Sequence, residues 1–414
     1  MGEAEGAESL IMLFAALEDP RIDRTKSYPL EEILFLVLAA VISGVNHMVE
    51  ISRFGHAKLD WLRTILPFEN GIPSHDTIGR VLGLLDSDAL EEMFRRWMTS
   101  VASTLEGVVA VDDKALRRAI RRGEKQSFVH MISAFSVANG LVYGQIKTDE
   151  KSNEIPAIVE LLKHLCLKGV VVTIDAAGCQ EKITKQIVEQ GGDFIIGVKA
   201  NQPTLHKDIG VAFHDIDING GKGFASISET ENLAHGRGEW RRCEVVSATK
   251  KLTHSEKWEP VRSLIRATSE RIVKSSKTLE SRYYMSSFKD FDAERVLAMT
   301  RSHWSIENRL HWNLDVSFQE DKSRVYAANA AENLVVVRHI ALNLLRSVKD
   351  VDGGIVSRRM QSAYDDTVRE KELCAGLNSM RCPWAGWRML QSCLKIGLQS
   401  QKRGVAIDCL SKRK

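Results

Sequence analysis

Three acidic residues stand where carboxylates could meet and bind a metal ion. Asp112 ends the apolar run VVAVD, Asp175 ends a second apolar run, VVVTID, and Glu307 lies later, in TRSHWSIENRLHWNLD. A carboxylate at the end of a buried strand is costly to desolvate unless positive charge lies beside it, and Mg²⁺ takes oxygen ligands of this kind. The alternative is that each aspartate only caps the turn that follows it. For the two aspartates together we favour the metal site.

The third acid is expected on an amphipathic helix. His303 and His311 lie four residues before and after Glu307, so all three share a helical face. Trp304 and Trp312 are expected to lie on a buried stripe of the same helix. Glu307 could then be an exposed residue with no chemical role. A zinc site formed by the two histidines is another alternative, but they are two turns apart and make a poor chelate.

A sheet is needed to bring the first two acids together. Apolar β-branched runs predict five strands, over residues 107–112, 128–137, 141–147, 170–174 and 194–198. Apolar residues at helical spacing predict three helices, over residues 154–166, 179–190 and 204–213. The order βββαβαβα predicts an α/β fold, a mixed sheet with flanking helices. It is also the order of ribonuclease-H-like folds. In that order the strands that end in Asp112 and Asp175 are neighbours.

The rest of the chain divides into further expected regions. Residues 1–105 are helical, with a buried helix over 33–42; a helix, turn and helix ending near residue 85 fits either a helix-turn-helix or a plain packing unit. The core begins with residues 106–214. Residues 215–290 predict a β-rich insertion, 291–350 the closing helices of the core, and 351–414 a C-terminal extension whose end, beyond 374, is loosely attached.

Composition sets broad limits on the function. The 414 residues carry 57 Lys and Arg against 54 Asp and Glu, so only a local basic patch could favour a polyanion. The 7 cysteines are scattered without CxxC spacing, which argues against a disulfide framework or a structural zinc site and fits a reducing cytoplasm. No apolar run is long enough to span a bilayer, and we expect no membrane partner.

Two basic clusters are candidates for DNA binding. They comprise Lys114, Arg117, Arg118, Arg121 and Arg122 after the first acid, and Arg237, Trp240, Arg241 and Arg242 in HGRGEWRR. Guanidinium groups neutralise phosphates, and tryptophan stacks on unpaired bases. A solvated loop and a basic hairpin without base contacts are the alternatives. Lys199 and Asn201, just past a core strand, could reach DNA near the acids or could form a polar turn.

Many separate motifs resemble one family of proteins. They are DPRIDRTKSYPLEEIL, FENGIPSHDTIGRVL, VDDKALRRA, EKSNEIPAIVELL, VVVTIDAAGCQ, DFIIGVKANQPTL, HGRGEWRR, YYMSS, RSHWSIENRLHWNLDVSFQED and NAAENLVVVRHIALNLL. In this order they resemble the DDE transposases of bacterial insertion sequences, in the branch that contains the H-repeat-associated proteins of Rhs elements. The resemblance covers roughly residues 9–370.

The resemblance implies a fold, an activity and a site. It implies a ribonuclease-H-like core in which Asp112, Asp175 and Glu307 are the catalytic, metal-binding triad for Mg²⁺, or Mn²⁺. Glu307 lies 132 residues after Asp175, an interval that accommodates the family's β-rich insertion. The implied partner is double-stranded DNA, as the ends of the element and as the target. A second copy of the chain is expected to join it on that DNA, and the implied location is the bacterial cytoplasm, at the nucleoid. A nuclease without strand transfer and a decayed DNA-binding copy are the alternatives.

The chain departs from the family in two places near the acids. Where related families carry a Tyr–Arg–Glu–Lys pattern around the glutamate, Thr300, His303 and Leu314 fill the other three positions. His303 is therefore expected to contact the scissile phosphate, and the role of the lysine must be filled elsewhere. The family's first acid precedes Gly-Lys, whereas here Asp113 stands in the place of the glycine, where we expect a turn.

Overall fold

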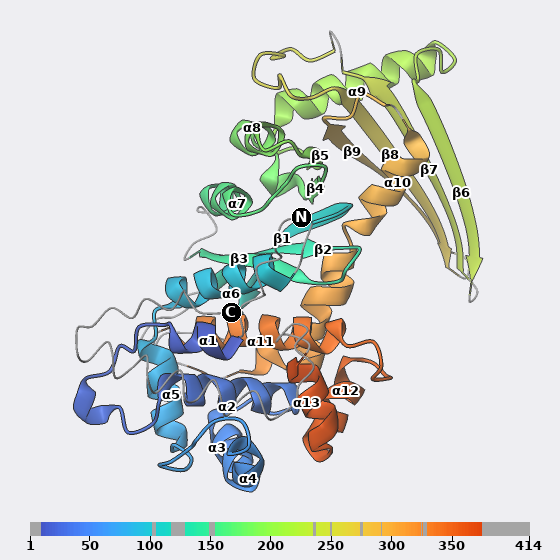
Figure 1. Ribbon diagram of the computed structural model, residues 1–414. Coiled ribbons are helices and arrows are strands. Elements are labelled where there is room, and N and C mark those ends of the chain that lie inside the picture. Colours follow the sequence, from blue (N-terminus) through green and yellow to red (C-terminus); the bar gives the residue numbers. More distant parts are fainter. Residues whose placement is uncertain are drawn as a thin grey trace, which may run out of the picture.

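One continuous sheet runs through the upper part of the molecule, and a layer of helices lies below it (Figure 1). The computed structural model describes residues 10–101, 105–116, 129–148, 154–234, 237–248, 251–273, 276–290, 292–323, 325 and 329–374. The expectation for the end of the chain beyond 374 lies outside these ranges. The nine strands are in the order β3-β2-β1-β4-β5-β9-β8-β7-β6.

The first five strands and their helices follow the predicted order closely. The strands are β1 (Val108–Leu116), β2 (Val129–Ser136), β3 (Val142–Thr148), β4 (Val171–Ile174) and β5 (Asp193–Val198), and the helices are α7 (Glu154–Lys163), α8 (Glu181–Glu189) and α9 (Pro203–Ile218). β1 pairs antiparallel with β2, and β1, β4 and β5 run parallel. The predicted mixed α/β sheet with neighbouring first and fourth strands is confirmed.

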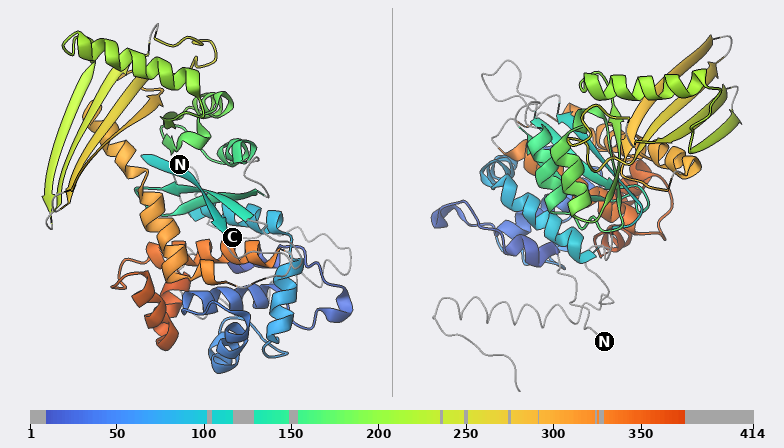
Figure 2. Two further views of the ribbon diagram at one scale, coloured as in Figure 1. Left: turned by 180° about the vertical axis from the view of Figure 1, so that it is seen from behind. Right: turned by 90° about the horizontal axis from the view of Figure 1, so that it is seen from above.

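The β-rich segment after α9 extends this sheet instead of forming one of its own. Its strands are β6 (Ser226–Ala234), β7 (Arg237–Ser247), β8 (Ser263–Val273) and β9 (Ser276–Ser286). β9 pairs antiparallel with β5, from Ile195 opposite Ser286 to Val198 opposite Tyr283. We call β6–β9 the extension sheet. Figures 1 and 2 show it curving away from the core strands, with α9 and α10 (Ala293–Ser302) lying against it.

The N-terminal helices pack with the C-terminal helices in one apolar core. The helices are α1 (Leu10–Ala15), α2 (Leu30–Ile42), α3 (Met48–Ala57), α4 (Leu59–Leu62), α5 (His75–Leu84), α6 (Ser87–Val101), α11 (Ala330–Ser347), α12 (Ile355–Tyr364) and α13 (Asp366–Cys374). Residues 33–42 are fully or almost fully buried, as predicted. Ser74 caps α5 by accepting a hydrogen bond from the Thr77 amide. The buried residues of α5 join the core that α11 shares, so this helix packs as part of the bundle.

No helix in the described parts of the chain combines the length and the apolar character needed to cross a bilayer.

Candidate active site

The first two acids directly follow the last residues that β1 and β4 pair with each other. Within the parallel pair of β1 and β4, Ala110 lies opposite Thr173 and Val111 opposite Ile174. Asp112 and Asp175 are the next residue on each strand. Parallel strands carry their carboxyl ends to the same edge of a sheet, so both side chains are brought to one place. The predicted neighbouring strands are confirmed, and Asp175 follows the last residue of β4. The prediction that Asp112 ends its strand is wrong, because β1 continues to Leu116 in its pairing with β2.

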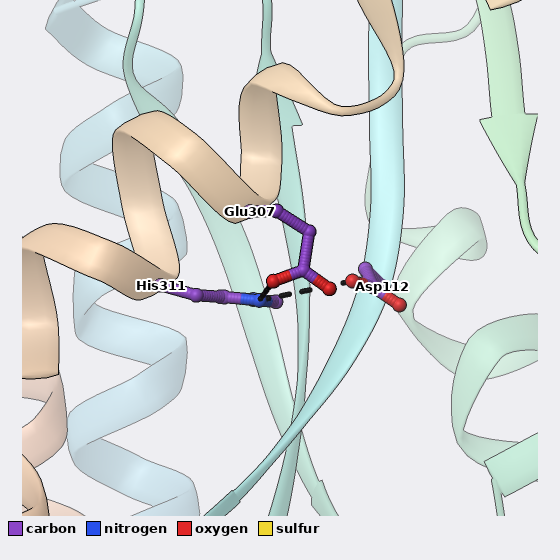
Figure 3. A group of neighbouring side chains, drawn as sticks. All are labelled: Asp112, Glu307 and His311. Carbon is purple, nitrogen blue, oxygen red and sulfur yellow. Dashed lines mark hydrogen bonds and ion pairs between the residues drawn. The ribbon is translucent and has the colours of Figure 1, made fainter. Parts of the chain in front are cut away.

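Glu307 reaches Asp112 from a π-helical segment after α10. This segment covers Ile306–His311, and a second one covers Asn313–Ser317. Figure 3 shows Glu307 pointing toward Asp112, with His311 beside both. His311 Nδ1 lies 3.4 Å from Glu307 Oε2 and 3.7 Å from Asp112 Oδ2. The ligand atoms of these three side chains all lie within 4.8 Å of one another.

The charges at this cluster fit a cation. Burial raises the pKa of Asp112 to about 8, and the negative charges of Glu307, Asp113 and Asp175 add to the effect. A hydrogen bond from His311 lowers the pKa of Glu307. His311 Nε2 is buried and has no hydrogen-bond partner among the described residues. Protonation of Asp112 relieves the repulsion between the carboxylates, and a divalent cation would do the same without the proton.

A cavity of about 300 Å³ joins all three predicted acids. Asp112, Asp175 and Glu307 line it, together with Thr173, Lys199, His303 and residues of β9. Asp175 lies farther from the cluster of Asp112, Glu307 and His311 and also caps a turn, since its Oδ1 accepts the Ala177 amide at 2.9 Å. The capping interpretation therefore describes Asp175 correctly, and its side chain still faces the cavity.

A glycine on β5 permits the close approach of this turn. A Cβ atom at Gly197 would lie 3.2 Å from the Ala176 amide nitrogen, which is tighter than most Cβ contacts. Asn201 donates a hydrogen bond to the Ala176 carbonyl at 2.6 Å. Asn201 thus holds the turn after Asp175, as the polar-turn alternative expects, while Lys199 lines the cavity itself.

His303 lies in the cavity wall. Its Nδ1 is 3.1 Å from Thr173 Oγ1, and burial lowers its pKa. The ring is thereby fixed against β4, close to the acids. Trp304 and Trp312 are 45% and 54% exposed, so the prediction of a buried tryptophan stripe is wrong. The π-helical turns change the angle between successive residues, and the stripe expected of a regular α-helix does not form.

Lys114 does not occupy the place predicted for it. Its ammonium lies 2.7 Å from Asp315 and 2.9 Å from Glu320, and its side chain is only 9% exposed. Glu320 is itself buried and pairs with Arg338 of α11 at 3.3 Å. The predicted phosphate contact of Lys114 is therefore not supported, because this ammonium already has two carboxylate partners. Arg117, Arg118, Arg121 and Arg122 lie outside the described residues.

The second basic cluster is divided between two faces of β7. Arg241 pairs with Glu239, whereas Arg242 pairs with Glu229 at 2.9 Å and with Glu244 at 2.8 Å. Trp240 is half-buried on the same face as Arg242. The side chain of Arg237 is outside the described part of the structure. The structure therefore places Arg241 on the opposite face of β7 from Trp240 and Arg242.

His311 is the site residue that sequence reasoning did not assign to the acids. The sequence places it on the helical face of Glu307 and gives it a role only in the alternative of a zinc site with His303, whereas the structure pairs it with Glu307 and Asp112. Its position four residues after Glu307 is the signal that could have identified it.

Comparisons with known proteins agree with this geometry. Residues 103–344 match the family described as "Transposase DDE domain", and residues 11–98 match the family "DDE_Tnp_1-associated". The chain is 40% identical over 373 residues to "Putative transposase YncI" of Escherichia coli O157:H7, covering 89% of this chain and 95% of that protein. It is also 40% identical over 347 residues to "H repeat-associated putative transposase YhhI" of Escherichia coli K12, covering 82% and 90%.

A solved structure is similar at a lower level. The piggyBac transposase in its synaptic complex with hairpin DNA aligns with a TM-score of 0.43 and 11% identity, over 93% of this chain and 84% of that one. The family assignment does not depend on this similarity.

Proposed function

Because the chain belongs to the Transposase DDE domain family, we propose that it is a DNA transposase that cuts and joins phosphodiester bonds at the cavity of Asp112, Asp175 and Glu307. The observation that carries the proposal is the meeting of these acids. Two of them follow the last paired residues of the neighbouring strands β1 and β4, and Glu307, 132 residues after Asp175, lies beside Asp112. Desolvating three carboxylates in one partly buried cavity costs free energy unless bound cations compensate their charge.

The acids are suited to holding divalent cations, Mg²⁺ or Mn²⁺. Asp112 and Glu307 would be ligands from β1 and the π-helical segment, and Asp175 a ligand from the end of β4. Two such ions, when bound, activate an attacking hydroxyl and stabilise the leaving oxygen of a phosphodiester. His311 would orient Glu307, to which it lies 3.4 Å away, and thereby keep that carboxylate directed at Asp112.

The protein's own side chains would place the substrate. Lys199 supplies a positive charge in the cavity wall that could contact the DNA backbone. His303, held by Thr173, is positioned to contact the scissile phosphate. Fixed placement of the attacking hydroxyl and the phosphate is the main contribution that a protein makes to this chemistry.

The wider proposal follows from family membership. The core, residues 106–214 with 291–350, would be ribonuclease-H-like; residues 1–105 would form its associated helical region and 215–290 its insertion. The partners would be the ends of an insertion-sequence element and a target duplex, held by a homodimer. The protein would act in a bacterial cytoplasm, at the nucleoid.

A strand-transfer assay tests this function. The purified protein would be incubated with Mg²⁺, a labelled duplex copied from the flanks of its own gene, and a plasmid target. We expect labelled ends joined to the plasmid, and none when Mg²⁺ is removed with EDTA. Cleavage without joining would favour a nuclease, and DNA retention without cleavage would favour a decayed copy.

A further inference from the structure

The two faces of the extension sheet differ in charge and in what covers them. Successive residues of a strand point to opposite faces, and paired residues on neighbouring strands share a face. We call the face that α10 contacts the inner face. Toward the outer ends of the strands it carries Glu239, Arg241, Ser269, Arg271, Thr278, Glu280 and Arg282, as the pairing of β7, β8 and β9 requires.

A cavity of about 570 Å³ opens between the inner face and α10. Its charged lining consists of Arg241, Arg271, Arg282, Arg301, Glu239 and Glu280. Four guanidinium groups therefore face two carboxylates, which leaves an excess of positive charge. The cavity has the charge of a polyanion-binding surface.

Two of the guanidinium groups remain accessible. The Arg271 side chain is 60% exposed, and its ion pair with Glu239 is long, at 3.4 Å. Arg301 is exposed on α10 and forms no ion pair with any residue that the structure describes. An exposed ion pair contributes little to stability, so a phosphate can replace Glu239 as the partner of Arg271 at small cost.

This cavity continues into the cavity of the acids. Glu280, Arg282, Tyr284, Thr300 and Trp304 line both. Glu307 lines the first cavity, and the next residue, Asn308, lines the second. A strand whose scissile phosphate lies at the acids can therefore continue along the inner face without leaving the protein surface.

The opposite face of the extension sheet lacks these properties. In the same outer region it carries three acids, Glu229, Glu231 and Glu270, against two bases, Arg242 and Lys277. Each of these bases has a carboxylate partner within 3 Å. Nearer the core, Arg266 of this face pairs with Asp217 of α9. This face is net negative where it is open.

We propose that the inner face of the extension sheet binds the phosphates of the DNA strand that enters the acid cavity, with Arg271 and Arg301 as phosphate contacts. The proposal rests on the transposase function and adds to it the surface along which the DNA lies. The proposal excludes the opposite face of the extension sheet, and with it Arg242, from binding the phosphates of the DNA.

The test compares two single changes that alter net charge equally on opposite faces. Arg271→Gln removes a charge from the inner face. Lys277→Gln removes one from the opposite face, on the paired strand and at a nearly equal side-chain exposure of 63%. Arg301→Gln, on α10, is the second inner-face variant. Binding of a fluorescein-labelled duplex of arbitrary sequence would be measured by anisotropy in EDTA at several salt concentrations, so that no cleavage is needed.

We expect Arg271→Gln and Arg301→Gln each to weaken binding several-fold and to reduce the slope of log K against log salt by about 0.9, the effect of one lost phosphate contact. Lys277→Gln should keep both the affinity and the slope of the parent protein. Equal losses of DNA affinity in the variants of the two faces, or no loss in either inner-face variant, would overturn the proposal. Neither result would count against the transposase function itself. Failure of the parent protein to bind DNA at all would instead count against the transposase function.

Discussion

At the scale of single residues, the adjacent Asp112 and Asp113 have different surroundings. β1 continues through both and pairs Asp113 with Ile132 of β2, so the expected turn at Asp113 is wrong. Successive strand residues point to opposite faces, and Asp113 lies 3.2 Å from His130 while Asp112 faces Glu307. Only the first of the two acids can therefore belong to the triad.

This separation predicts different outcomes for two matched variants. Asp113→Gly should keep or raise cleavage, because it removes a negative charge that raises the pKa of Asp112. The loss of folding free energy should be limited to roughly 0.5–1 kcal/mol, the cost of a glycine within a strand. Asp112→Gly should abolish cleavage. Parallel cleavage assays, with Asp113→Asn as a control for backbone freedom, decide the matter; activity in the Asp112 variant with loss in the Asp113 variant would move the catalytic acid.

At the scale of elements, a buried ion network ties the strand of Asp112 to the segment of Glu307. Lys114 lies two residues after Asp112 and therefore on the same face of β1. It pairs with Asp315 of the second π-helical segment and with Glu320, which pairs in turn with Arg338 of α11. We infer that this network fixes the separation between the two carboxylates. It can thereby fill the role of the lysine that the chain lacks at Leu314.

Removal of the central cation should disturb both stability and metal use. Lys114→Met removes the cation that Asp315 and Glu320 share and leaves Glu320 with Arg338 alone. Loss of one partner of a buried pair typically costs about 3–5 kcal/mol. We expect a lower melting temperature and, in protein that remains folded, a higher Mg²⁺ concentration for half-maximal cleavage. Lys114→Arg should recover part of both.

The matched control is Lys185→Met. Lys185 also pairs with a glutamate, Glu181, at 2.6 Å, but both side chains are about 40% exposed. An exposed pair of this kind is screened by solvent and contributes little to stability. If Lys114→Met used Mg²⁺ as well as the Lys185 variant does, the positioning role of Lys114 would be wrong.

At the scale of the whole molecule, the sequence patterns predicted the core elements and the pairing of β1 with β4, but missed the pairing of the extension sheet with β5. The spacing of apolar residues predicted β1 to β5 and their helices with nearly the observed boundaries, since the strand and helix periods are local properties of the sequence. These patterns could not show that β9 pairs with β5, because pairing partners 89 residues apart, such as Ile196 and Met285, leave no local signal.

The candidate site was predictable to a similar extent. Asp112 and Asp175 were predicted because each ends an apolar run of the sequence, and Glu307 was predicted from its place in a resembling motif. The π-helical turns around Glu307 have no 3.6-residue period to reveal them, which is why the exposure of Trp304 and the contacts of His311 were missed. The buried partners of Lys114 come from distant segments, so its sequence neighbourhood of basic residues suggested a surface role instead.

The central claim is that these three acids together form the DNA-cutting site, and Glu307→Gln tests it most directly. The change keeps the size of the side chain and removes the charge that faces Asp112. Cleavage of the labelled element end with Mg²⁺ would be measured alongside DNA retention in a gel shift. We predict that the variant retains DNA as the parent protein does and shows no detectable cleavage. Cleavage at the parental rate would contradict the assignment of the site.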